Sequence, residues 1–209
     1  MSGARVVIFA KAPLPGLAKT RLIPSLGAAG AASLAQRMLR HTLAQALAAA
    51  VGPVELCVDP APQDAVWQSL PVPAAVIWSD QGEGDLGTRM ARATRRVTAT
   101  GDSILLIGTD CPALDAPRLC TAAAALQQAD ATMIPTVDGG YVLIGLKRFH
   151  PTLFEDIAWS TESVAQETLQ CLRTLNWTVQ EHPMLRDIDE PADLAWLPAG
   201  WLEPVRPHD

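Results

Sequence analysis

The sequence predicts an α/β protein with one mostly parallel sheet and helices on both of its faces. Short continuous apolar runs, of which Val6–Ala10 and Ser103–Gly108 are the clearest, fit strands that are buried on both faces. They alternate with helical stretches at spacings typical of parallel strands joined by crossover helices. The 209 residues are 49% hydrophobic and 18% charged, which excludes a disordered chain and suits a single domain. We assign residues 1–197 to this domain and the Pro-rich residues 198–209 to a C-terminal tail.

The first half of the chain shows the alternation most clearly. Val6–Ala10 is expected to be the first and central strand. An Ala-rich helix is predicted at Gly27–Ala50, because its leucines form one apolar stripe. Val54–Val58 and Ala74–Trp78 are the next predicted strands, and a weaker helix at Gln63–Leu70 separates them.

The second half continues with strands and capped helices. Ser103–Gly108 is the most hydrophobic predicted strand. Asp85 and Asp115 are expected to cap the helices that follow them, and Ser160 or Thr161 a third helix. The remaining predicted elements are helices at Ala116–Gln128 and Glu162–Leu175 and strands at Ala131–Pro135, Tyr141–Leu146 and Thr178–His182.

Charge and cysteine content limit the classes of partner. A formal net charge of -6 argues against binding to nucleic acid or to an anionic membrane surface. No apolar run approaches the length of a membrane span or a signal sequence, so we expect a soluble, cytoplasmic protein. The cysteines lie far apart and form no CxxC motif, so we expect neither a disulfide nor structural zinc. We interpret Cys57, Cys120 and Cys171 as small core residues and Cys111 as a packed thiol rather than a nucleophile.

A loop with three cations follows the first predicted strand. The cations are Lys11, Lys19 and Arg21, and Pro13 and Gly16 prevent the loop from continuing as helix or strand. Open α/β sheets bind anionic ligands at the carboxyl ends of their strands, so this loop is a candidate phosphate site. The alternative is that the three cations are ordinary solvated loop charges.

A second loop, Ser79–Met90, follows the third predicted strand and contains Gly82, Gly84 and Gly87. Glycines leave the backbone free to approach a ligand closely. A flexible surface loop would have the same composition, so the ligand-lining interpretation depends on the position of the loop at a strand end.

Three acidic positions are candidate metal ligands. Asp110 comes directly after the Ser103–Gly108 strand and Thr109, and a Pro-terminated turn holds it there, as suits a carboxylate that binds Mg²⁺ or Mn²⁺. The alternative is that Asp110 caps the next helix. Asp187 and Asp189 point the same way if the backbone between them is extended. They are either a second metal ligand or the acidity that is common at helix N-termini.

A hairpin turn is predicted at Asp138-Gly139, the strongest short turn signal in the chain. Asp138 and Tyr141 lie where the second strand of the hairpin begins, and their polar tips could also orient a substrate. Among the tryptophans, Trp159 is the one we expect to line a pocket.

Together these segments resemble a bacterial family. Their order is that seen in the proteins grouped as DUF2064, which belong to the nucleotide-diphospho-sugar transferase superfamily with the GT-A fold, and some of which are labelled glycosyltransferases associated with arsenosugar biosynthesis. The resemblance covers Val6 to Leu194. Ala18–Leu22 also resembles the first loop of the 2-phospholactate guanylyltransferases, which are nucleotidyltransferases of the same fold. The matching segments are Ala10–Leu22, Gln81–Met90, Gly108–Pro112, Asp138–Tyr141, Trp159–Thr161 and Asp187–Asp189.

The resemblance implies a role for each segment. Lys19, Arg21, Asp110 and Asp138 would be the catalytic residues, and Asp110 would hold Mg²⁺ or Mn²⁺ together with Asp189 or Asp187. The nucleotide would be bound by Ala10, Lys11, Pro13, Gly16, Lys19, Arg21, Gly84, Leu86, Gly87, Arg89 and Thr109. The transferred group would face Asp138, Gly139, Gly140, Tyr141, Trp159, Ser160 and Thr161.

Three functions remain open from the sequence. The leading hypothesis is a metal-dependent transferase that acts on a nucleotide-activated small molecule, with glycosyl transfer from a nucleotide-diphospho-sugar to an unknown acceptor. The first alternative is nucleotidyl transfer from a nucleoside triphosphate, because Cys111 and Pro112 follow Asp110 where many GT-A glycosyltransferases carry a second aspartate. The second alternative is a nucleotide-binding protein without catalytic activity. The sequence leaves the oligomeric state open.

Overall fold

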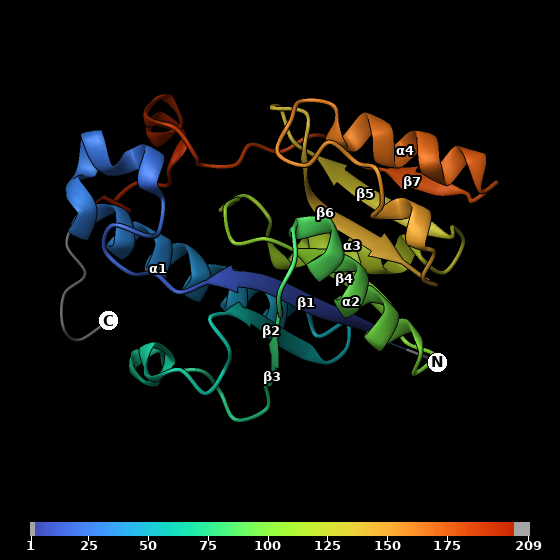
Figure 1. The fold of residues 1–209 in the computed structure, drawn as a ribbon, viewed down its shortest axis with the longest axis horizontal. Coiled ribbons are helices and arrows are strands. Elements are labelled where there is room, and N and C mark those ends of the chain that lie inside the picture. Colours follow the sequence, from blue (N-terminus) through green and yellow to red (C-terminus); the bar gives the residue numbers. More distant parts are fainter. Residues whose placement is uncertain (1–2, 203–209) are drawn as a thin grey trace.

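One seven-stranded sheet organises the protein. The computed structural model describes residues 3–202, in the strand order β3-β2-β1-β4-β6-β5-β7 (Figure 1). β1 pairs in parallel with β2 and β4, β3 with β2, and β7 with β5, whereas β6 is antiparallel to both of its neighbours. The mostly parallel sheet of the sequence prediction is therefore confirmed. The strands are β1 Ala4–Lys11, β2 Val54–Asp59, β3 Ile77–Asp80, β4 Ser103–Ile107, β5 Ala131–Pro135, β6 Tyr141–Leu146 and β7 Val179–Glu181.

Helices cover both faces of this sheet. One apolar cluster joins α1 and α3 to side chains such as Ile8 and Leu105, and a second joins α2 and α4 to side chains such as Val7 and Leu106. Successive strand residues thus face opposite layers, as the continuous apolar runs predict. Figure 1 shows α2 in front of the sheet and α1 behind it. The helices are α1 Ile23–Ala49, α2 Leu86–Thr98, α3 Ala116–Ala125 and α4 Val164–Thr174, with short 3-10 helices η1 Thr20–Leu22, η2 Ala65–Ser69, η3 Pro151–Leu153 and η4 Pro191–Trp196.

The main differences from the prediction concern the limits of the elements. β1 is the first strand, but β4 rather than β1 is at the middle of the order, because the β5–β6 hairpin and β7 extend the sheet beyond β4. α1 begins before Gly27, whose φ of 69° interrupts the helix. The third strand begins only at Ile77, because the Val76 N–H donates to the Pro73 carbonyl in a turn. The weak helix predicted before it is the 3-10 helix η2.

The predicted caps are confirmed for two of three helices. Asp85 accepts a hydrogen bond from the Thr88 N–H at 2.8 Å, and Asp115 accepts one from the Arg118 N–H at 3.0 Å. The prediction of Ser160 or Thr161 as the cap of α4 is wrong, because α4 begins only after Ser163. The hydroxyl of Thr161 instead donates to the Ala158 carbonyl at 2.6 Å, which closes the turn before the helix.

The remaining predictions are met in part. Cys57 and Cys111 are buried, but Cys120 is exposed and Cys171 half-buried, so the core prediction is wrong for Cys120. The described part of the predicted tail packs on α1, where the Trp201 ring lies edge-on to His41; residues 203–209 lie outside the described residues. Within residues 3–202, no helix combines the length and apolarity that a membrane crossing requires.

Candidate functional site

Lys19 is the centre of the candidate site. Its ammonium lies 2.6 Å from Asp110 Oδ1 and 2.7 Å from Asp189 Oδ1, and it donates a hydrogen bond to the Ile188 carbonyl at 2.5 Å. These contacts use all three donors of the ammonium. The Lys19 side chain is only 8% exposed. Burial alone would lower the pKa of Lys19, but Asp110 and Asp189 outweigh burial and hold that pKa above its usual value, so the side chain stays charged.

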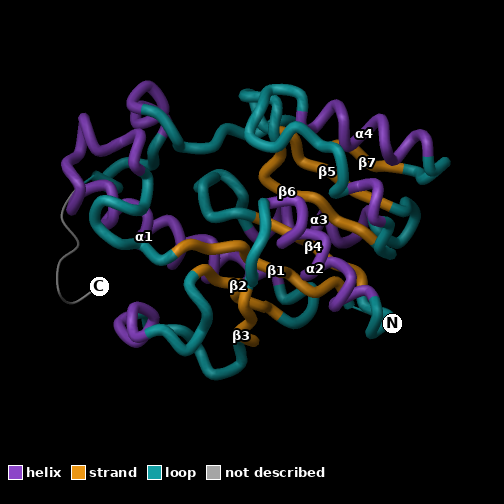
Figure 2. The backbone as a smooth tube through the Cα atoms, in the orientation of Figure 1, coloured by secondary structure: helices purple, strands orange, loops and turns teal. Residues whose placement is uncertain are grey.

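The topology explains why Lys19 and Asp110 meet. Lys19 follows β1 and Asp110 follows β4, and these strands are parallel neighbours. Parallel neighbours end at the same edge of a sheet, so the loops after them lie together. Figure 2 shows both loops on one side of the molecule. The Ile188 N–H donates to the Asp110 carbonyl at 2.8 Å, which docks the segment after β7 onto the same loop.

A small apolar cluster fixes this third segment. Leu22 of η1 and Ile188 are fully buried together against the N-terminal half of α1. In an extended segment successive side chains point to opposite sides, so the burial of Ile188 turns Asp187 and Asp189 toward the site. The cluster thus holds the Lys19 loop and the two aspartates in one position relative to each other.

Acidic side chains dominate the electrostatics of the site. Burial, and then the negative charges of Asp138, Asp189 and Asp110, raise the pKa of Asp187 to about 6. Like charges at short range disfavour ionisation, so the shift indicates that four carboxylates share one region. Asp138 enters this region from the β5–β6 turn, where its Oδ1 accepts hydrogen bonds from the Thr136 hydroxyl and the Gly140 N–H. The predicted hairpin turn is therefore confirmed.

The donor chemistry of the site fits a hard divalent cation, since carboxylate oxygens are the ligands that Mg²⁺ and Mn²⁺ prefer. The present arrangement, however, is that of an ammonium site. Over residues 3–202, no three acidic, His or Cys side chains are placed to hold a metal ion together. The Lys19 ammonium instead lies between Asp110 and Asp189 and provides the positive charge that these carboxylates share.

The other two cations of the first loop behave differently from Lys19. Lys11, the last residue of β1, is exposed. Arg21 is 67% exposed, and its Nη1 lies 4.0 Å from Glu190 Oε1, a distance at which an exposed pair contributes little. Lys11 and Arg21 can therefore reach a ligand in solution, whereas Lys19 is already engaged. Pro13 and Gly16 lie between them, and Gly16 has a φ of 81°.

Arg89, in the first turn of α2, holds the second loop in place. Its Nη1 donates to Asp59 Oδ2 at 2.7 Å, and its Nε donates to the Gly84 carbonyl at 2.9 Å. The guanidinium predicted to bind a nucleotide thus already braces the loop from within. Asp59, at the end of β2, was missed as a site residue, although its position after a buried strand is the signal that singled out Asp110.

Gln81 anchors the start of the same loop and is a second residue that sequence reasoning missed. Its side chain is buried, and its Nε2 donates to the Ala10 and Cys57 carbonyls, both at 3.1 Å. It therefore ties the loop to the ends of both β1 and β2. Leu86, at the start of α2, is 43% exposed and is the loop residue with an apolar side chain open to solvent.

Two glycines bring the predicted substrate segments together. A Cβ on Gly87 would overlap Trp159 Nε1 and lie 2.5 Å from the Phe154 carbonyl, so Trp159 packs on the first turn of α2. Gly139 has a φ of 91°, and a Cβ there would overlap the backbone of Glu162. The β5–β6 turn thus packs against Glu162, the residue that directly follows the Trp159–Thr161 segment.

The Tyr141 side chain lies elsewhere than the position of Asp138 suggested. Its hydroxyl is buried in the α2–α4 layer, on the side of Thr168 in α4. Burial raises the pKa of Tyr141. The hydroxyl therefore points into the core rather than to the rim on which Asp138 lies.

Two other predicted site residues have distinct local geometry. Ser160 has a φ of 66°. The hydroxyl oxygen of Thr109 lies 3.5 Å from Asp110 Oδ1.

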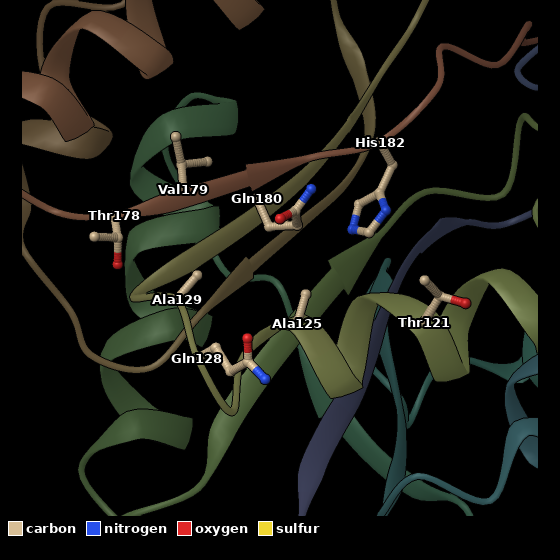
Figure 3. A pocket seen from close by; sticks show the side chains of 8 residues that line it. All are labelled: Thr121, Ala125, Gln128, Ala129, Thr178, Val179, Gln180 and His182. Carbon is tan, nitrogen blue, oxygen red and sulfur yellow. The ribbon is translucent and has the colours of Figure 1, made fainter.

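A depression of about 540 Å³ lies elsewhere, between α3 and the edge strand β7 (Figure 3). None of the residues that line it belongs to the predicted site. They are Thr121, Ala125, Gln128, Ala129, Thr178, Val179, Gln180 and His182.

Comparisons with known proteins place this geometry in a family. Residues 42–161 match the family described as "Uncharacterized protein conserved in bacteria (DUF2064)". A crystal structure from Desulfovibrio desulfuricans G20, described as a "putative nucleotide-diphospho-sugar transferase", is 31% identical, with a TM-score of 0.84 over 91% of this chain and 84% of that one. No curated protein sequence matches.

Two more distant structures share the fold alone. A CMP:2-keto-3-deoxy-manno-octonic acid synthetase complexed with CTP is 13% identical, with a TM-score of 0.57 over 93% of this chain and 96% of that one. The 2-C-methyl-D-erythritol 4-phosphate cytidylyltransferase from Thermus thermophilus is 14% identical, with a TM-score of 0.53 over 94% and 97%. The family match and the 31% identical relative together show that the chain belongs to the bacterial family DUF2064.

Proposed function

We propose that this protein is a metal-dependent transferase for a nucleotide-activated substrate, and that it transfers a glycosyl group from a nucleotide-diphospho-sugar. The observation that carries the proposal is the meeting of Lys19, Asp110 and Asp189 at the carboxyl edge of the sheet. Cations for phosphate and carboxylates for a divalent ion are the two requirements for binding a diphosphate. The description of the 31% identical relative supports the same class of reaction.

In this proposal the first loop binds the phosphates. Exposed Lys11 and Arg21 attract the diphosphate, and Lys19 stabilises the negative charge that builds on its oxygens during transfer. Ala10, Pro13, Gly16 and Thr109 complete the phosphate side of the site. When bound by Asp110 with Asp189 or Asp187, Mg²⁺ or Mn²⁺ would neutralise the leaving group. Catalysis would therefore consist mainly of positioning and electrostatics.

The remaining segments bind the two ends of the substrate. Gly84, Leu86 and Gly87 would line the nucleoside, with Arg89 holding their loop in place through Asp59. Asp138, Gly139 and Gly140 of the β5–β6 turn would face the transferred group. Trp159, Ser160 and Thr161 would form the opposite wall, because Gly139 and Gly87 both pack against this part of the chain.

A second reaction has a specific observation in its favour. Asp110 is followed by Cys111 and Pro112, so the end of β4 offers one aspartate rather than two. A single aspartate at this position, with a partner from a later segment such as Asp189, also suits nucleotidyl transfer. In that reaction a phosphate oxygen of the substrate attacks the α-phosphorus of a nucleoside triphosphate, and pyrophosphate leaves with the electron pair of the broken bond.

Product analysis tests both reactions. The purified protein would be incubated with Mg²⁺ or Mn²⁺ and panels of nucleoside triphosphates and nucleotide sugars. Free nucleoside diphosphate indicates glycosyl transfer, and pyrophosphate indicates nucleotidyl transfer. Neither product, with nucleotide binding intact, would refute the proposal and favour a binding protein.

Two variants test the assignment of residues. Asp110→Asn is expected to abolish metal-dependent turnover without unfolding the protein, and Lys19→Ala to weaken nucleotide binding. Asp64→Asn is a matched control, because exposed Asp64 caps η2 by accepting from the Val66 N–H and is not among the candidate site residues, so turnover should be unchanged. Full activity of Asp110→Asn would remove Asp110 from the mechanism.

A further inference from the structure

The contacts of the Lys19 ammonium make it unavailable to a phosphate. With Asp110, Asp189 and the Ile188 carbonyl within 2.7 Å, the ammonium has no donor left for a phosphate. The same contacts engage one oxygen of each carboxylate that a divalent ion would use. The ammonium and a divalent ion therefore compete for the same carboxylate oxygens.

We infer that Lys19 is a built-in occupant of the cation site, which a divalent ion displaces from Asp110 and Asp189 so that the ammonium becomes free to meet the phosphates. The inference rests on the proposed function, since it assumes that these carboxylates take up a metal. It adds an order of events: metal entry comes first, and the first loop acquires its third phosphate-binding cation as a consequence.

Geometry and chain chemistry support this exchange. Mg²⁺ binds oxygen at about 2.0–2.1 Å, so it would have to replace the ammonium rather than sit beside it. The two cations would repel each other strongly at such separation in a partly buried site. The long flexible stem of lysine allows the ammonium to leave while the backbone stays in place. Lys11 and Arg21, exposed on the same loop, mark the side to which phosphate would draw it.

Metal binding without nucleotide is the first test. Mn²⁺ affinity would be measured by electron paramagnetic resonance for the wild type, Lys19→Met and Lys11→Met. If Lys19 holds the carboxylates in at least nine molecules of ten, its removal should tighten Mn²⁺ binding about tenfold or more, because apparent affinity scales with the fraction of open sites. Lys11→Met removes the same charge from the same loop without touching the carboxylates, so its affinity should change less than about twofold.

A second measurement uses the wild-type protein and does not depend on a variant that folds. Lysine occurs at positions 11, 19 and 147 only, so each side-chain amine can be followed by mass spectrometry after reductive methylation. Lys19 should be protected without metal and should become reactive when Mg²⁺ is added. Lys11 and Lys147 are exposed and should react equally in both conditions.

The outcomes separate this inference from the proposed function. An Mn²⁺ affinity that is unchanged or weaker in Lys19→Met, or Lys19 reactivity that ignores Mg²⁺, overturns the exchange. If transfer products form only in the presence of the metal, the transferase proposal still stands. Tighter Mn²⁺ binding by Lys19→Met together with an absence of any transfer product would support the exchange and refute the proposed reaction.

Discussion

The contact between Gly87 and Trp159 gives a prediction in which two effects of opposite sign compete. Gly87 lies in the first turn of α2 with an ordinary helical φ, so replacement by Ala should stabilise the helix by about 1 kcal/mol from backbone propensity alone. The new methyl group would, however, overlap the Trp159 indole and lie 2.5 Å from the Phe154 carbonyl. Overpacking of this kind costs about 1–3 kcal/mol. We therefore expect Gly87→Ala to lower the free energy of unfolding by up to about 2 kcal/mol.

Urea unfolding measures this balance, and two further variants isolate its parts. Gly30→Ala is a helical control, because a Cβ there meets a single side-chain carbon at 3.2 Å; it should be neutral or stabilising. In a Trp159→Ala background the Gly87→Ala change should cost at least about 1 kcal/mol less, since the indole is gone. If Gly87→Ala stabilises the protein as much as Gly30→Ala does, the packing of Trp159 on α2 is refuted.

Two more predictions concern the stability contributed by Glu55 of β2 and by Gly139 of the β5–β6 turn. Burial alone would raise the pKa of Glu55, but hydrogen bonds from Arg96, Ser79 and Arg5 hold that pKa below 4.5. Glu55 therefore contributes stability that is present above pH 4.5 and is lost as the pH falls through its lowered pKa. Glu55→Gln should cost about 1–3 kcal/mol at pH 7 and should show a smaller loss between pH 5 and pH 3 than the wild type; parallel pH profiles in urea unfolding would contradict this. Gly139→Ala should destabilise the protein by about 2 kcal/mol or more, from its positive φ and from overlap with Glu162. Gly101→Ala has a similar φ of 86° and open space around it, so it should lose only about 1 kcal/mol; equal losses in thermal melts would deny the contact with Glu162.

The meeting of Lys19 and Asp110 could be predicted because it follows from topology. Each residue comes after a continuous apolar strand, and strands of this type lie side by side in a parallel sheet, so their loops share one edge. The caps at Asp85 and Asp115 could be predicted for a similar reason, since they depend only on local backbone geometry.

The remaining features depend on contacts that leave no local pattern. Asp189 reaches Lys19 because Ile188 is buried against Leu22, and nothing in the sequence around Leu185 shows where this segment crosses the sheet edge. Tyr141 turns inward at a register shift near Pro135, and such a bulge reverses the face to which a side chain points. Arg89 in the first turn of α2 reaches Asp59 at the end of β2, and no local sequence pattern indicates this pairing.

The most direct test of the account is a crystal structure of the protein with Mn²⁺ and a nucleoside diphosphate, in which anomalous scattering locates the manganese. We predict manganese bound by Asp110 and Asp189, with the phosphates against the Lys11–Arg21 loop and the Lys19 ammonium turned toward them. A nucleotide bound at another place, such as the depression between α3 and β7, with Lys19 still between the two aspartates, would contradict it.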